Sequence, residues 1–344
     1  MSVCVEYVWL GSNQELHSKI KVLYTEVSSI EDIPRWHFNG NATNQSGIEN
    51  SDVVLVPRKM FPNPFLRVYI DYLVLCDTYT PIGVPTLTNT RYLAYDRFSQ
   101  CVKEEPWFGI EQEYFLINPS TGKPLGFPPY GLPQPEGQYY CSVGIENTFG
   151  RIIAEQHMGY CLQAGIHIAG INSEIAPGQW EFQIGPCLGI DTSDQLWMAR
   201  YILNRVAETN RIIVNYNPKP LDGDWSGSGC HVNYSTKKMR EGSETQDGLY
   251  YIMQAIDELE LHHENDINVY GINNEKRLTG DHETSQYYYF SKGVMDRGAS
   301  VRINCETIRD KKGYLEDRRP GANCDPYLVT SQLFQTTVLD VNSL

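Results

Sequence analysis

The sequence has no long apolar run, no block of basic residues and no closely spaced pair of cysteines. No segment approaches the roughly 20 apolar residues of a membrane-spanning helix, and residues 1–15 lack the basic start and apolar stretch of a signal peptide. The formal net charge is −14, which argues against nucleic acid or an anionic membrane as the main partner. We therefore expect a soluble, cytoplasmic protein with neither kind of partner.

Two kinds of sequence signal are also missing. The nine cysteines are scattered, odd in number and without a CxxC pair, so we expect reduced thiols rather than disulfides or structural zinc. A Walker A loop and a glycine-rich kinase loop are absent, so any nucleotide would have to be held in another way. What the chain does have is length, since 344 residues are enough for two domains with substantial cores.

Strand-like and helix-like patterns divide the chain into two parts. Runs rich in β-branched and aromatic residues predict strands at 3–10, 18–23, 52–57 and 69–78, before proline and glycine punctuation at 81–85. Helical spacing predicts helices at 86–102, 148–164, 193–215, 248–263 and 327–339, the third capped at 192–194. The pattern predicts an α+β protein with a small β domain over 1–80 and a large α+β domain over 86–344.

The most informative segment is WFGIEQEY, residues 107–114, in which two glutamates lie two positions apart. Side chains of a strand alternate between its faces, so Phe108, Ile110 and Tyr114 would face a core. Glu111 and Glu113 would then point together the other way, about 7 Å apart, and repel by about 2 kcal/mol at an effective dielectric constant of about 20. A cation between them would offset this repulsion, although a solvated strand face is the commoner reason for such a pair.

Four further segments repeat this alternation and add polar side chains to faces of the same kind. They contribute Glu181, Asn172 with Glu174, His231 with Asn233 and Ser235, and Glu316 with Arg318. Five such segments in one domain predict a polar site lined by acids, an imidazole and guanidinium groups. Oxygen ligands with a single histidine suit Mg²⁺ or Mn²⁺.

Arginines late in the chain supply the opposite charge. They are Arg277, Arg297, Arg302, Arg318 and Arg319. Guanidinium forks suit phosphate and carboxylate groups, although any single arginine is more often solvated or paired with an acid. Divalent cations combined with several arginines suggest phosphoryl transfer, in which positioning and charge neutralisation supply most of the catalysis.

Six ordered motifs carry a resemblance to a known family: WFGIEQEY, NSEIAPGQWEFQIGP, GSGCHVNYST, RLTGDHETS, ASVRI and YLEDRRPGANCDPY. From about Val3 to Leu339 the chain resembles glutamine synthetase of the eukaryotic-type (type II) class. The resemblance implies an N-terminal β-grasp-like domain and a C-terminal catalytic domain whose antiparallel sheet forms a funnel-shaped active site. It also implies a homo-oligomer of two stacked pentameric rings, a decamer, in which each site is completed by the neighbour's N-terminal domain.

Positions that match the family's motifs acquire implied roles. Two or three Mg²⁺ or Mn²⁺ ions are implied at Glu111, Glu113, Glu174, Glu181, His231 and Glu316. The implied ATP contacts are Glu111, Glu181, Asn233, Tyr234, Ser235, Arg297, Arg302 and Tyr314. L-Glutamate would be bound by Trp225, Arg277 and Arg318. The implied catalytic residues are Asn39, Glu283, Arg297 and Arg318, with Glu283 as the flap residue that closes over the site.

The implied reaction joins ammonium to L-glutamate at the expense of ATP. The γ-carboxylate of glutamate attacks the γ-phosphoryl group, and ammonia then displaces phosphate from γ-glutamyl phosphate to give L-glutamine. Water must be excluded while the acyl phosphate exists.

Two positions depart from the family's pattern. Asn39, in FNGNAT, replaces the aspartate of a DGSST-like motif that helps bind ammonium and take its proton, although the flanking Trp36 and Asp52 match. An amide cannot act as a base at neutral pH, and loss of a general base typically costs about 10²–10⁴-fold in rate. Asn304 and Cys305 replace a proline and a basic residue, with no defined effect.

Three functions are compatible with these motifs. The first is a working synthetase, either with weak ammonium capture or with another group serving as base. The second, motivated by Asn39, is a γ-glutamylamide ligase that uses another amine. The third is a non-catalytic structural homologue of glutamine synthetase, which the presence of all six implied metal ligands disfavours.

Overall fold

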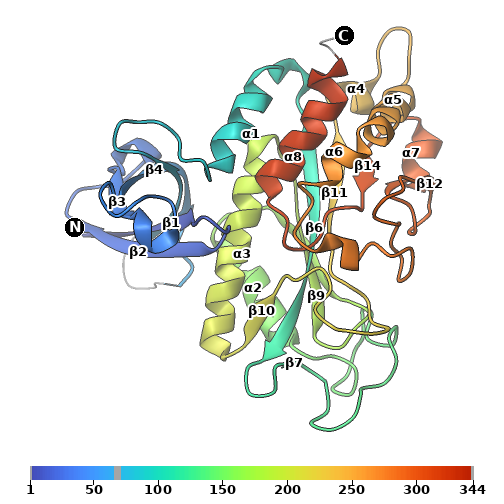
Figure 1. Cartoon of the computed structure of the whole chain (residues 1–344), viewed down its shortest axis with the longest axis horizontal. Helices are drawn as coiled ribbons and strands as arrows, with labels where there is room; N and C mark the ends of the chain where they lie inside the picture. The colour runs from blue at the N-terminus through green and yellow to red at the C-terminus, as the bar shows by residue number, and fades with distance from the viewer. Residues whose placement is uncertain (1, 66–70, 342–344) are drawn as a thin grey trace. The chain divides into compact units, whose positions relative to one another are not determined.

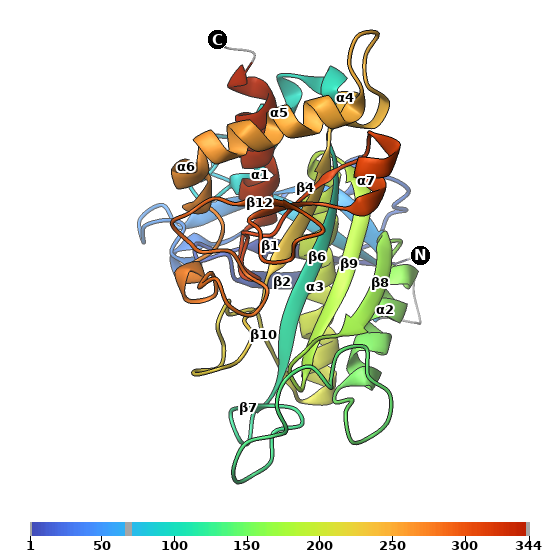
Figure 2. The ribbon, with the colours of Figure 1, turned by 90° about the vertical axis from the view of Figure 1, so that its right-hand side faces the viewer.

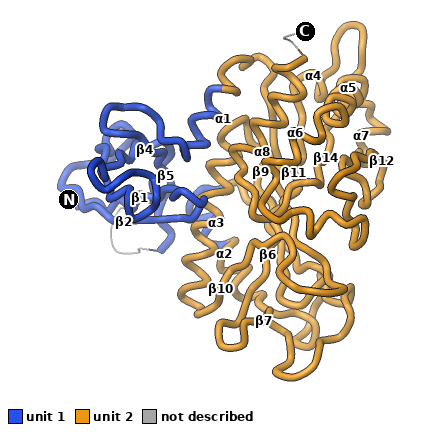
Figure 3. Tube along the Cα trace, viewed as in Figure 1, with its two compact units in different colours: residues 1–96, 159–166 blue, residues 97–158, 167–344 orange. Residues whose placement is uncertain are grey.

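The computed structural model describes residues 2–65 and 71–341. The backbone forms two compact units, coloured in Figure 3. Unit 1 comprises residues 1–96 and 159–166, and unit 2 comprises residues 97–158 and 167–344.

Unit 1 is built on a five-stranded sheet in the order β2-β1-β5-β4-β3. Its strands are β1 (Val3–Leu10), β2 (Leu16–Leu23), β3 (Trp36–Asn39), β4 (Asp52–Pro62) and β5 (Asp71–Tyr79), with single helical turns at η1 (Ile30–Asp32) and η2 (Gly40–Thr43). β1 runs parallel to β5, and the other neighbouring pairs are antiparallel. Buried Val5, Tyr7, Leu55 and Val74 give this sheet its own apolar core.

Unit 2 is built on a larger, mostly antiparallel sheet. The main path runs β12-β13-β14-β11-β6-β9-β8, and β7 and β10 also pair with β6. The strands are β6 (Trp107–Asn118), β7 (Lys123–Pro124), β8 (Ile168–Ser173), β9 (Gln179–Leu188), β10 (Ile213–Asn215), β11 (Cys230–Ser235), β12 (Lys292–Val294), β13 (Val301–Ile303) and β14 (Leu315–Asp317). The long strand β6 is central, which places its side chains between those of β9 and β11.

The described residues also form helices. They are α1 (Thr90–Ser99), α2 (Arg151–Gln163), α3 (Ile190–Asn210), α4 (Lys237–Glu241), α5 (Gly248–Leu261), α6 (His263–Ile267), α7 (Cys305–Asp310) and α8 (Pro326–Phe334), with short turns η3 (Val102–Glu104), η4 (Asn274–Lys276) and η5 (Gln335–Leu339) (Figure 1). The long α3 lies behind β6 and β9 in Figure 2 and packs against both strands. It therefore leaves the other face of these strands for polar side chains.

The two faces of β6 differ as the alternation predicts. Phe108, Ile110 and Tyr114 are buried, whereas Glu111 and Glu113 on the opposite face are partly exposed. Gln112 also lies on the buried face, where its Oε1 accepts two hydrogen bonds from the Arg200 guanidinium of α3, at 2.9 and 2.6 Å. This pairing satisfies a polar group that would otherwise be costly to bury.

The predicted helix over 193–215 is wrong at both ends. It begins at Ile190, and Thr192, Ser193 and Asp194 are buried in its first turns rather than capping it. Asp194 instead accepts a hydrogen bond from the hydroxyl of Tyr327. The helix ends at Asn210, because the β-branched residues that follow form β10 and pair with the edge of β6.

Most other predicted elements are confirmed with shifted ends. The strands at 3–10 and 18–23 form the β1–β2 hairpin, and the strand at 52–57 extends to Pro62 as β4. Of the strand at 69–78, Tyr69 and Ile70 lie outside the described residues, and β5 begins at Asp71. The mixed α+β class is confirmed, all nine cysteines are free thiols, and none of the described helices has the length and hydropathy that crossing a membrane requires.

Candidate functional site

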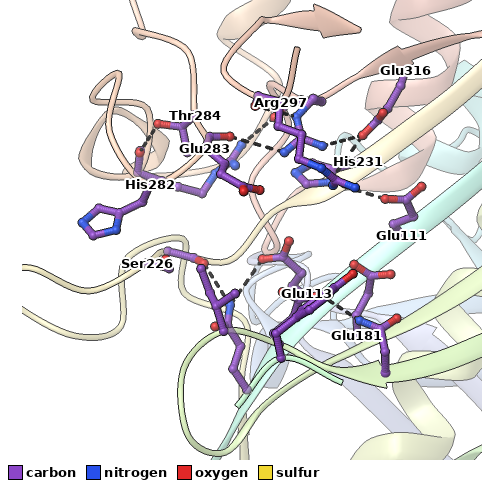
Figure 4. Close-up of a pocket in the computed structure, with 18 of the residues that line it drawn as sticks. Glu111, Glu113, Glu181, Ser226, His231, His282, Glu283, Thr284, Arg297 and Glu316 are labelled. Atoms are coloured by element: carbon purple, nitrogen blue, oxygen red, sulfur yellow. Dashed lines mark hydrogen bonds and ion pairs between the residues drawn. The ribbon is translucent and has the colours of Figure 1, made fainter. Parts of the chain in front are cut away.

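The polar faces of β6, β8, β9, β11 and β14 open onto one cavity of about 390 Å³ in unit 2 (Figure 4). Eleven predicted site residues line it: Glu111, Glu113, Glu174, Glu181, His231, Arg277, Glu283, Arg297, Arg302, Glu316 and Arg318. The cavity thus gathers acids, one imidazole and guanidinium groups from segments more than 200 residues apart.

One acidic group lies where β6, β11 and β14 run side by side. Strand register places Glu111 opposite His231, and Glu316 opposite Asn233. One ligand atom each from Glu111, His231 and Glu316 lies within 4.8 Å of the others. Two carboxylates and an imidazole nitrogen at this spacing are a donor set that fits Mg²⁺ or Mn²⁺.

The carboxylates of this group are held by strong partners. Each oxygen of Glu316 accepts one hydrogen bond of 2.6 Å, from Arg302 and from Arg318. Burial opposes ionisation of Glu111, but His231 and Asn233 lower the pKa of this carboxyl to about 2. Glu111 is therefore ionised at neutral pH.

A second acidic group lies where β6, β9 and the end of β8 meet. Register places Glu113 directly opposite Glu181, and Glu174 follows β8. Burial together with nearby carboxylates raises the pKa of Glu181 to about 9, and burial together with Glu113 raises that of Glu174 to about 8. The three carboxylates fit a second divalent cation, which would relieve this repulsion.

Amide side chains link these acids. The Asn172 amide donates to Glu174 at 2.9 Å, and the Gln183 amide donates to Asn172 at 2.8 Å and also to Glu181. Glu113 accepts a hydrogen bond of 2.8 Å from the backbone of Gly229. The amides and the backbone thereby fix the orientation of carboxylates that would otherwise repel one another.

The arginines differ in how they are held. Arg277 is buried, donates to three consecutive backbone carbonyls at 318–320, and has a pKa lowered to about 10 by burial. The Nε of Arg302 is buried and has no hydrogen-bond partner among the described residues, so it is an open donor. Arg297 is exposed, and its carbonyl accepts a hydrogen bond from Arg318.

Arg319 does not join the cavity, so its predicted contribution to the site's charge is wrong. It is fully buried and forms a two-pronged ion pair with Asp317. The physical reason is that side chains alternate between the two faces of an extended chain. Arg319 therefore lies on the same face as Asp317, opposite to the face of Glu316 and Arg318.

Four of the eight predicted ATP contacts line a neighbouring cavity of about 400 Å³. Asn233, Ser235 and Tyr314 line it, and Glu111 and Gln183 border both cavities. Tyr234 points to the opposite face of β11, where it is buried and stacks on Phe108. Trp225 lies in a small apolar cluster with Phe115 and Ala176, next to Ser226 of the first cavity.

Asn39 is the one predicted site residue that belongs to unit 1. It is exposed at the end of β3, and its Oδ1 accepts a hydrogen bond of 3.2 Å from the backbone of Asn41. Asn39 is thereby the N-cap of η2. The other departure, Asn304, caps α7 through a bond of 2.7 Å from the backbone of Thr307.

Sequence reasoning missed several residues of the cavity. Tyr140, Ser226 and His282 line it from loops, where no periodic pattern indicates which side chains face inward. The motif RLTGDHETS pointed to Glu283 but gave no role to its neighbour His282.

Comparison with known proteins agrees with this geometry. Residues 91–341 match the glutamine synthetase catalytic domain. The chain belongs to the glutamine synthetase family. The glutamine synthetase cytosolic isozyme 1-1 of Oryza sativa subsp. japonica is 48% identical over 341 residues, which cover 98% of this chain and 94% of the relative. The glutamine synthetase nodule isozyme of Medicago sativa is 49% identical over 98% of this chain and 94% of the relative. The glutamine synthetase cytosolic isozyme 1-3 of Arabidopsis thaliana is 48% identical over 98% of this chain and 95% of the relative.

Membership of the glutamine synthetase family covers both units. The relatives align over nearly the whole chain, including the stretch that contains Asn39. The cavity in unit 2 lies within the part that matches the glutamine synthetase catalytic domain.

Proposed function

We propose that this chain is a glutamate–ammonia ligase, which forms L-glutamine from L-glutamate, ammonia and ATP through γ-glutamyl phosphate. The observation that carries the proposal is the first cavity, in which two acidic groups face Arg277, Arg302 and Arg318 within the matched catalytic domain. Acids that can hold cations, opposed to several arginines, suit the transfer of a phosphoryl group to a carboxylate.

The two acidic groups are the proposed metal sites, for two or three Mg²⁺ or Mn²⁺ ions. Glu111, His231 and Glu316 would hold one ion, and Glu113, Glu174 and Glu181 the other or others. Such ions, when bound, neutralise charge on phosphate and carboxylate oxygens. Glu316, clamped by two guanidinium groups, keeps its carboxylate in one orientation for this purpose.

The proposed substrate positions follow from the two adjoining cavities. ATP would place its base near Asn233, Ser235 and Tyr314, and its phosphates in the first cavity, where the open Nε of Arg302 suits a phosphate oxygen. Arg297 would assist there, and the buried Tyr234 would support the β11 wall from behind. L-Glutamate would be bound by Arg277 and Arg318, with Trp225 behind the adjacent loop.

The proposed reaction then has two steps. The γ-carboxylate of glutamate attacks the γ-phosphoryl group of ATP, and Arg302 and Arg318 stabilise the charge that develops. Ammonia next attacks the acyl phosphate, phosphate leaves, and the excess proton must pass to a base. Glu283 lines the cavity and would shield the acyl phosphate from water. Asn39 cannot itself take the proton, so this step would be slow or use another base.

Family membership also supports a wider picture. We expect unit 1 to correspond to a β-grasp-like N-terminal domain over 1–80, and 86–344 to form the catalytic domain with a funnel-shaped site. We expect a decamer of two pentameric rings, in which a neighbour's Asn39 contributes to each site. Relatives named cytosolic isozymes support a cytoplasmic location.

The test is an assay of glutamine and phosphate with ATP, glutamate and ammonium, in Mg²⁺ and in Mn²⁺. We expect ATP-dependent glutamine formation. Glu316→Gln should lower its rate by about 10²-fold or more, because a neutral amide cannot balance the charge of two guanidinium groups and a cation. The matched control is Glu244→Gln, an exposed glutamate in a loop, which should leave the rate unchanged. No glutamine from an assembled oligomer with either metal would reject the ligase and leave a structural homologue.

A further inference from the structure

The ring of His282 bridges Glu136 and Asp224, two acids to which the proposed reaction gives no role. Its Nδ1 lies 3.3 Å from Oε2 of Glu136, and its Nε2 lies 2.9 Å from Oδ1 of Asp224. In Figure 4 the ring points away from Glu111 and Glu316, toward the side of Ser226. A ring protonated on both nitrogens would pair with both carboxylates.

Burial separates the two partners of this ring. The side chain of Asp224 is 99% exposed, so solvent screens its attraction to the ring. Those of Glu136 and His282 are 15% and 25% exposed, so this pair is better shielded despite its longer distance. Glu136 is therefore the partner expected to matter more.

Glu136 is itself fixed to the wall of the cavity. Its carboxylate accepts hydrogen bonds from the backbone N–H of Ser226, at 2.5 Å, and from the Ser226 hydroxyl, at 3.0 Å. Ser226 and Gly227 line the cavity. Through Glu136, the loop that bears His282 is thus tied to the cavity wall.

That loop has an unusual backbone. His282 and Glu283 both have left-handed conformations, with φ of 51° and 58°. Such conformations are uncommon for residues other than glycine, although asparagine, aspartate and histidine adopt them more often than the rest. Two such residues in succession persist only where surrounding contacts hold them. Inside the loop, the Thr284 hydroxyl contacts the carbonyls of Arg277 and Asp281, and Arg318 donates to the carbonyl of Glu283 at 3.3 Å. The His282 ring adds contacts to Glu136 and Asp224, which lie on other loops.

We propose that Glu136 and His282 form a latch that positions Glu283 over the cavity and so keeps water from the acyl phosphate. Both are positioning residues, since neither needs to touch the reacting atoms. The effect of the latch on water depends on the proposed function. The ordering of the loop by the latch does not depend on it. An opened latch lets water compete with ammonia, so ATP is spent without forming glutamine.

The first test is the ratio of phosphate released to glutamine formed. We expect about one in the natural protein, and a rise of about threefold to tenfold in Glu136→Gln. Glutamine keeps one oxygen to accept from the Ser226 backbone but loses the charge. Tenfold corresponds to about 1.4 kcal/mol. His282→Gln should behave alike, and Asp224→Asn should change the ratio less. The control is Glu146→Gln, an exposed glutamate on the same stretch of chain.

A double-variant cycle and hydrogen exchange decide whether the residues act together. The double variant should be no worse than either single variant, because the first change already opens the latch, whereas additive effects would reject the pair. Amides of 279–287 should exchange at least about threefold faster in Glu136→Gln than in Glu146→Gln, without substrates present. Unchanged exchange overturns the latch, whereas absent glutamine synthesis by the natural protein overturns only the proposed function.

Discussion

Two glutamates of this cavity have pKa values shifted in opposite directions. Glu111 and Glu181 lie on neighbouring strands, yet the pKa of the first is lowered to about 2 and that of the second raised to about 9. Glu111 accepts a hydrogen bond from Asn233 and lies beside His231, whereas Glu181 faces other carboxylates. Without a cation, the protein thus keeps Glu111 ionised at neutral pH and holds a proton on Glu181.

The residue on which amination depends is Asn39. We expect Asn39→Asp to raise glutamine formation at limiting ammonium by about 10-fold to 10³-fold, because a carboxylate can take the proton that an amide cannot. The substitution should fold, since aspartate caps a helical turn as well as asparagine does and can accept the same bond from Asn41. Initial rates over a range of ammonium concentrations measure the effect.

The control for this change is Asn39→Ala, which loses the cap and gains no base. It should be less stable than the natural protein and no faster with ammonium. If Asn39→Asp left the ammonium dependence unchanged, another group would have to be the base.

Pairing between strands explains why the second acidic group needs a cation. Like charges directly opposite one another on neighbouring strands destabilise a sheet, and Glu113 lies opposite Glu181. The raised pKa values of Glu174 and Glu181, about 8 and about 9, mean that the folded protein keeps protons that the unfolded chain has lost. Without divalent cations, the free energy of unfolding should therefore fall as the pH rises from about 4.5, the pKa of glutamate in the unfolded chain, through about 9.

Divalent cations should reverse this fall, because they replace the protons and bind only the folded state. The increase in Tm on adding Mg²⁺ or Mn²⁺ to chelator-treated protein should be several degrees larger at about pH 9 than at about pH 6. Glu181→Gln should flatten the pH dependence measured in chelator. An equal increase in Tm at both pH values would contradict the raised pKa values of Glu174 and Glu181.

Elements with a strong period could be predicted from the sequence, and elements without one could not. Alternation in WFGIEQEY and QWEFQI placed the acids of β6 and β9 on the correct face, and helical spacing located α1, α2, α5 and α8. The end of α3 was wrong because tertiary pairing with β6 overrides the helical pattern. Strands of three residues, such as β12 and β13, are too short to show a period.

The candidate site divides in the same way. Acids on strands follow from spacing, but His282, Ser226 and Glu136 meet from three separate loops, and only tertiary structure brings them together. Roles for Glu283 and Asn39 came from resemblance to a family, because neither spacing nor composition distinguishes them from solvated loop residues.

At the scale of the whole molecule, the division of predicted site residues between two units is the main feature. The cavity belongs to unit 2 and Asn39 to unit 1. We expect native mass measurements to give a decamer, and glutamine formation to fall on dilution in step with dissociation, because each site would need a neighbour's unit 1. A fully active monomer would show that one chain completes its own site.

The Arg200–Gln112 pair behind β6 has a consequence for this whole arrangement. A strand that slips by one residue exchanges its two faces, so a slipped β6 would turn Gln112 toward the cavity and drive Glu111 and Glu113 into the apolar interior. Arg200 is held by the carbonyls of Ala322 and Cys324, and it would lose its bonds to Gln112 if β6 slipped. Arg200 and Gln112 therefore help to fix the spacing of the proposed cations. They do so from the buried face of the sheet, on the side away from the cavity.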